Sequence, residues 1–223
     1  VGGPHTFTGN INISGGTLGL TDDGIGSAAN VNIPKAAMVA YGGTVNTGTT
    51  GLDVSSFHIG DMSIPEVKTM MMLYPVAAIW DNPAYPGVLH NAFIDAGIPS
   101  FTPEVGAARR LDLDAIPLFV EGTLNVFKHY GVIPGAIGRT AVDANVYVGR
   151  NAVPVLATQG GFIELLVKLE DDVTAGQKLA IQRNAFGEVM AEYISPVNGR
   201  IGGMRSDATS EPGNVLVFIL AGG

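Results

Sequence analysis

Hydrophobic and polar residues alternate along the first part of the chain, and this pattern predicts short strands. Apolar side chains take every second position in residues 10–13 and again in residues 30–33, and Ser14-Gly15-Gly16 lies between these runs. Alternation indicates a strand with one buried face, and glycine-rich clusters indicate turns. We therefore expect residues 1–46 to form a glycine-rich β segment.

The pattern changes in residues 47–140, where helical periodicity alternates with short apolar runs. Apolar residues recur at three- and four-residue spacing in residues 65–74, 89–96 and 116–130, and the run VAAIW at residues 76–80 predicts a buried strand. Ser63 and Glu66 have the spacing of a helix capping box. Strands and helices that alternate in this way favour an α/β unit with parallel strands, whose active edge lies at the strand C-terminal ends.

Residues 141–223 return to a strand pattern. Short apolar runs at residues 153–156, 161–164, 178–181 and 215–218 are separated by turn clusters. The phrases DDVTAGQ (171–177) and SPVNGRI (195–201) resemble the barrel-sandwich hybrid fold of biotinyl and lipoyl carriers. A carrier presents a lysine at its hairpin tip, whereas the tip here reads Asn184-Ala185-Phe186-Gly187. We therefore interpret this part as a structural β module.

Composition narrows the partners that we expect. The chain of 223 residues has a net charge of −8, so a nucleic-acid partner is not expected. It contains no cysteine, which excludes disulfides and thiolate metal sites. No apolar stretch reaches membrane-spanning length, so no membrane partner is expected either.

One acidic residue stands out as a candidate for chemistry. The run GIPSFTPEVG (97–106) predicts an apolar strand that carries Glu104 toward a glycine turn. A carboxylate on a core strand is costly to bury unless another group pairs with it or uses it. Glu104 is therefore either a functional carboxylate or the ion-pair partner of Arg109 or Arg110.

Five phrases, in order, resemble the succinylglutamate desuccinylase/aspartoacylase family of zinc-dependent deacylases. They are TGTTG (47–51), YPGVL (85–89), GIPSFTPEVG (97–106), EGTLNV (121–126) and residues 186–198. The resemblance covers about residues 47–223. It implies a shortened zinc-carboxypeptidase-like α/β portion (47–140) followed by a C-terminal barrel-sandwich-like β domain (141–223), and it favours the cytoplasm. Residues 1–46 do not match this family and weakly resemble autotransporter-type glycine-rich β repeats; plain surface strands are the alternative.

The resemblance also implies roles for particular residues. Glu104 takes the place of the general base, Arg109 could hold a substrate carboxylate, and Thr49 and Thr50 are candidate substrate contacts. The family uses zinc as its cofactor, held by an early H-x-x-E motif and a histidine just before TGTTG.

The sequence lacks the zinc ligands at the positions where the family has them. Asn46 stands at the position of the expected histidine, and an amide oxygen is a poor zinc ligand compared with imidazole. His5 follows a family-like glycine start, but Thr8 replaces the glutamate. His58 is a further candidate because it follows TGTTG closely.

Two functions of different classes remain open at this point. The first is a deacylase that cleaves the amide bond of a small N-acyl carboxylate substrate. The second is a non-catalytic structural or binding relative, in which the first 46 residues replace the metal-binding half. A third alternative is that residues 1–46 are joined to this protein from elsewhere. Unpaired strand edges in the glycine-rich segment make a homo-oligomer possible.

Overall fold

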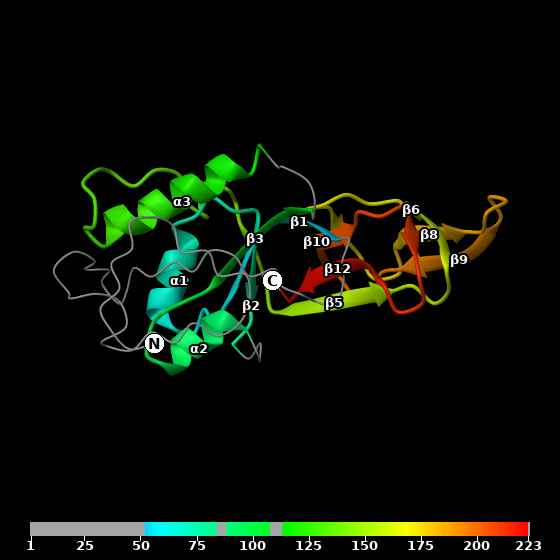
Figure 1. Cartoon of the computed structure of the whole chain (residues 1–223), viewed down its shortest axis with the longest axis horizontal. Helices are drawn as coiled ribbons and strands as arrows, with labels where there is room; N and C mark the ends of the chain where they lie inside the picture. Colours follow the sequence, from blue (N-terminus) through cyan, green and yellow to red (C-terminus); the bar gives the residue numbers. More distant parts are fainter. Residues whose placement is uncertain (1–51, 84–87, 108–112, 223) are drawn as a thin grey trace, which may run out of the picture. The chain divides into compact units, whose positions relative to one another are not determined.

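The computed structural model describes residues 52–83, 88–107 and 113–222, which form a mixed α/β structure (Figure 1). No helix within these ranges is long and apolar enough to cross a membrane. The helices are α1 (Pro65–Met72), α2 (Leu89–Asp95) and α3 (Ile116–His129). The strands are β1 (Leu52–Gly60), β2 (Ala78–Asp81), β3 (Thr102–Ala107), β4 (Tyr147–Gly149), β5 (Asn151–Leu156), β6 (Gly161–Leu165), β7 (Asp172–Val173), β8 (Lys178–Arg183), β9 (Val189–Ile194), β10 (Gly199–Arg205), β11 (Thr209–Ser210) and β12 (Val215–Ala221).

The large sheet is organised around β1. Its strand order is β4-β2-β1-β10-β12-β5, and β3 pairs with β1 as well. Strands β1, β2 and β4 are parallel, as the sequence predicts, whereas β3 runs antiparallel to β1. The register places Gly60 opposite Asp81 and Ile59 opposite Thr102, so β3 begins at the edge where β1 and β2 end.

The antiparallel direction of β3 corrects the expectation of a purely parallel α/β unit. Strand β2 ends and β3 begins at the same edge of the sheet, so β3 runs back in the opposite direction. As a result, Glu104 does not lie at the C-terminal end of a parallel strand. It lies within β3 opposite Phe57, on the way toward the beginning of β1.

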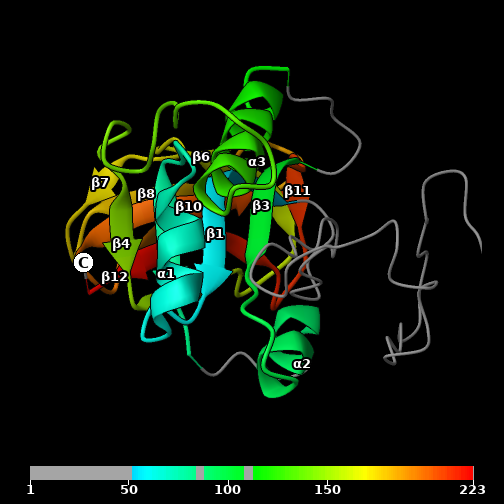
Figure 2. The same cartoon turned by 90° about the vertical axis from the view of Figure 1, so that its left-hand side faces the viewer.

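Helices α1 and α3 cover one face of this sheet (Figure 2). Val67, Met70 and Met71 of α1 pack in one core cluster with Ile79 of β2 and Phe119 of α3. The predicted capping box of α1 does not form, because Ile64 is the N-cap and provides no side-chain hydrogen bond. The hydroxyl of Ser63 donates instead to a carboxylate oxygen of Asp61 at 2.5 Å.

The buried face of α3 agrees only in part with the apolar stripe that the sequence predicts, because it includes Phe119 but not three other residues of the stripe. Ile116, Val120 and Leu124 are 43, 52 and 39% exposed, respectively. The helix instead turns Gly122 toward the core, where an added Cβ would lie 1.9 Å from Cδ1 of Tyr74. Because the Tyr74 ring packs directly on the helix backbone at Gly122, the approach of these two residues fixes the rotation of α3.

The C-terminal strands form a second core. A four-stranded sheet of order β11-β6-β8-β9 contributes Leu179 and Tyr193, which pack with Ile201, Leu216 and other apolar residues of β10 and β12. The two phrases that suggest a carrier fold lie side by side, with Gly199 opposite Val173. The described strands form no closed barrel, so the barrel-sandwich architecture is not confirmed. Because β10 pairs with β1, both parts of the chain share one sheet, and the predicted division at residues 140/141 stays a prediction.

Candidate functional site

Glu104 lies on a partly open face of β3. Its partner in the register is Phe57 of β1, and the side chain of Glu104 is only partly buried. Phe57 and Ile59 belong to a small core cluster on the face of the sheet opposite to α1 and α3. Since directly paired residues point to the same face, Glu104 shares that face with Phe57.

A buried histidine contacts Thr102, which shares this face of β3 with Glu104. Thr102 precedes Glu104 by two residues, so both side chains leave the same face of β3. His90 of α2 contacts this threonine, with its Nδ1 2.6 Å from Oγ1 of Thr102. His90 is only 2% exposed, and burial lowers its pKa.

His58 does not lie with Glu104. It follows Phe57 on β1 and therefore points to the opposite face, where its ring contacts Tyr74, Phe101 and Phe119 edge-on. It is fully buried, and neither ring nitrogen has a hydrogen-bond partner within the described ranges. Burial lowers the pKa of His58 to about 3, so the ring is neutral at physiological pH. These surroundings make His58 a core residue rather than a ligand.

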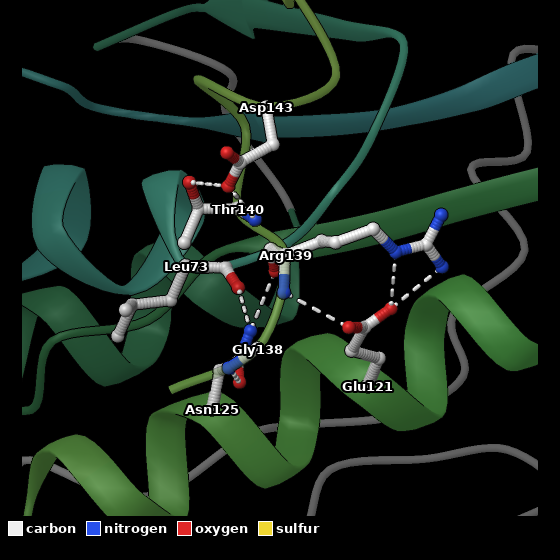
Figure 3. Close-up of polar contacts among 7 residues, drawn as sticks. All are labelled: Leu73, Glu121, Asn125, Gly138, Arg139, Thr140 and Asp143. Carbon is white, nitrogen blue, oxygen red and sulfur yellow. Dashed lines mark hydrogen bonds and ion pairs between the residues drawn. The ribbon is translucent and has the colours of Figure 1, made fainter. Parts of the chain in front are cut away.

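The phrase EGTLNV forms a structural clamp on α3. Asn125 is fully buried and donates through Nδ2 to the carbonyl oxygens of Leu73 and Arg139, at 2.9 and 2.7 Å. Its Oδ1 accepts a hydrogen bond from the amide of Gly138 at 2.7 Å (Figure 3). One side chain therefore ties the end of α1 and the segment after α3 to the same helix.

Glu121 completes this clamp one helical turn earlier. Its carboxylate accepts hydrogen bonds from the Arg139 backbone amide and, at 3.0 and 2.7 Å, from Nε and Nη2 of the same residue (Figure 3). These hydrogen bonds lower the pKa of Glu121. Thr123 adds a hydrogen bond between its hydroxyl and the Tyr74 hydroxyl at 3.1 Å. The polar residues of this phrase thus have structural partners.

The other predicted site residues lie outside the described residues. They are His5, Asn46, Thr49, Thr50 and Arg109, together with Arg110. In the chain, Thr49 and Thr50 come shortly before β1, and Arg109 comes shortly after β3. Their proposed roles remain predictions.

The described residues do not fit a zinc centre by themselves. Within these ranges, no group of three or more His, Cys, Asp or Glu side chains is placed to hold a metal ion. Glu104 and His58 point to opposite faces of the sheet and cannot share one ion. Catalytic zinc needs three protein ligands and an open position.

Comparison with solved structures identifies the fold. The ectoine utilization protein EutE (DoeB) from Ruegeria pomeroyi, in its apo form, matches with a TM-score of 0.69 and 17% identity, over 78% of this chain and 58% of that chain. A succinylglutamate desuccinylase/aspartoacylase from Rhodobacter sphaeroides matches with a TM-score of 0.66 and 16% identity, over 77% of this chain and 55% of that chain. This chain has the desuccinylase/aspartoacylase fold.

The same fold recurs in an aspartoacylase family protein from Mesorhizobium loti, with a TM-score of 0.59 and 10% identity, over 77% of this chain and 60% of that chain. The chain thus spans less than two thirds of the length of these proteins with the desuccinylase/aspartoacylase fold. No family model matches the sequence, and no curated protein sequence does so either. The resemblance to autotransporter repeats has no support.

The His90–Thr102 contact is the feature that sequence reasoning missed. The spacing of Thr102 and Glu104 on a predicted strand already indicates that both side chains share a face. No sequence signal connects His90 to them, because α2 brings it to β3 only in the folded chain.

Proposed function

We propose that this chain contributes to hydrolysis of the amide bond of a small N-acyl carboxylate substrate, with Glu104 as the general base. The observation that carries the proposal is a partly exposed carboxylate on β3 in a desuccinylase/aspartoacylase fold. Thr49 and Thr50, which precede β1, are the proposed contacts to the acyl part of the substrate. Arg109, which follows β3, is the proposed partner of the substrate carboxylate, because guanidinium groups bind carboxylates in bidentate fashion.

The chemical step assigned to Glu104 is a proton transfer. Its carboxylate accepts a proton from a water molecule while the water oxygen forms a bond to the acyl carbon. The same proton passes to the amide nitrogen as the carbon–nitrogen bond breaks, which yields a carboxylic acid and a free amine and restores the Glu104 carboxylate. The described donors do not complete a zinc centre by themselves, so no step is assigned to a metal here.

The alternative is a non-catalytic binding relative of the same fold. Asn46 favours it, since an asparagine stands where the resemblance requires an imidazole ligand. Both alternatives keep Glu104 on an accessible face, but only the hydrolase predicts turnover of substrate.

The test measures hydrolysis and metal content on the same preparation. Purified full chain is assayed for amine release from N-acetylaspartate and N-succinylglutamate, and zinc is quantified by mass spectrometry. We expect turnover that falls at least about 100-fold in E104Q, in line with the loss of a general base. E66Q is the matched control, because Glu66 is an exposed carboxylate at the start of α1. Absence of turnover by zinc-supplemented wild type would refute the hydrolase and favour the binding relative.

A further inference from the structure

His90 combines burial, a short contact and an unused nitrogen. Its Nδ1 lies 2.6 Å from Oγ1 of Thr102, and its Nε2 is buried without a hydrogen-bond partner within the described ranges. Burial lowers its pKa, so the ring is neutral, with one N–H group and one bare nitrogen. The position of that single proton determines whether the Thr102 hydroxyl donates or accepts the hydrogen bond with His90.

Two tautomers are possible, and their costs differ. A proton on Nε2 would leave a buried N–H group without an acceptor among the described residues, and native structures rarely tolerate such a group. A proton on Nδ1 makes His90 the donor and Oγ1 of Thr102 the acceptor. In that tautomer the hydroxyl hydrogen of Thr102 is available to a third group.

That third group must lie on the face of β3 that carries Glu104. Residues two apart on a strand lie about 6.7 Å from one another, so a small group that binds between the two side chains contacts both of them. Both Thr102 and Glu104 are partly exposed, so a ligand can reach this position. A ligand carboxylate at this position would be repelled by Glu104, whereas a neutral acyl carbonyl would not.

We propose that the Thr102 hydroxyl donates a hydrogen bond to the acyl carbonyl oxygen of the substrate, and that His90 is the positioning residue that orients this hydroxyl. The inference rests on the proposed function, because it assigns a second catalytic group to the same face. Glu104 takes the proton of water on one side of the acyl group, and Thr102 stabilises the negative charge that develops on the carbonyl oxygen on the other.

Hydrolysis kinetics of the full chain test the donor. We expect T102V to lower kcat about 100-fold with little change in KM, because the hydrogen bond strengthens as charge develops, and T102S to retain most of the rate. For His90, an asparagine amide reproduces a donor at the Nδ1 position, so H90N retains activity and H90L loses it. Thermal melts of each variant separate these effects from unfolding. Equal kcat values for T102V and wild type would overturn the inference while leaving Glu104 as the base.

Two spectroscopic measurements test the inference without relying on substrate hydrolysis. Nitrogen-15 NMR of the ligand-free chain should show the Nδ1-protonated tautomer of His90; the Nε2-protonated tautomer overturns the proposal. The second measurement is the infrared stretching frequency of the acetyl carbonyl in N-acetylaspartate labelled there with carbon-13. It is recorded with the ligand bound to E104Q and bound to E104Q/T102V. We expect a lower carbonyl stretching frequency in E104Q than in the double variant. An equal carbonyl frequency in the two variants, or no binding by E104Q, overturns the inference. A frequency difference that depends on Thr102, found together with no turnover by the wild type, supports the hydrogen bond and refutes the hydrolase.

Discussion

Acid should destabilise this fold through His58, and the size of the effect follows from its burial. The side chain has no exposed surface, its ring nitrogens lack partners in the described structure, and burial lowers its pKa from 6.5 to about 3. The unfolded chain binds a proton at this histidine below pH 6.5, whereas the folded chain does not do so until pH 3. Stability due to the neutral ring is therefore complete above pH 6.5 and declines as the pH falls toward 3.

The slope in that window is about 1.4 kcal/mol per pH unit, so the loss between pH 7.5 and pH 5 is about 2 kcal/mol. Replacing the imidazole with an apolar ring in H58F removes this contribution. We compare the free energy of unfolding of wild type with that of H58F. Their difference should change by about 2 kcal/mol between pH 7.5 and pH 5, because the packing effect of the substitution does not depend on pH. His90, whose pKa burial also lowers, keeps its contribution in both proteins.

Urea unfolding followed by Trp80 fluorescence and by circular dichroism at several pH values measures this difference. H129Q is the matched control, because His129 is exposed at the end of α3 and its replacement leaves the aromatic cluster of His58 intact. Parallel pH dependences for wild type and H58F would refute the reasoning, since they would show that the folded chain protonates His58 as readily as the unfolded chain does.

Three further outcomes test the packing of α3. G122A should destabilise the fold by about 2 kcal/mol in thermal unfolding, because its Cβ would lie 1.9 Å from Cδ1 of Tyr74; an unchanged melting temperature would contradict the close approach. N125A should cost about 3 kcal/mol, since it leaves buried backbone groups unpaired, and a loss under 1 kcal/mol in urea unfolding would show that water replaces the amide. R139Q should leave the melting temperature nearly unchanged, because the loss of an exposed ion pair costs little stability, while NMR titration shows a higher pKa for Glu121; an unchanged pKa would refute the pairing.

The sequence predicts most elements of the described fold because local patterns determine them. The apolar run before Trp80, the helical spacing after Ile116 and the regular short runs after residue 150 all correspond to elements of the predicted type. The phrases that resemble the desuccinylase/aspartoacylase family likewise anticipated the fold that the solved structures share. These features depend on spacing along the chain, which can be read directly.

The direction of β3, the face of α3 and the neighbours of each histidine depend on contacts between distant residues. Glycine at position 122 admits the Tyr74 ring, and this contact, rather than the apolar stripe, decides which side of α3 is buried. His58 and His90 look alike in sequence, yet one lies among aromatic rings and the other contacts a hydroxyl beside Glu104. By itself the sequence determined the strand that carries Glu104. Only tertiary packing brought His90 to Thr102, because the helix and the strand had to meet before the two side chains could touch.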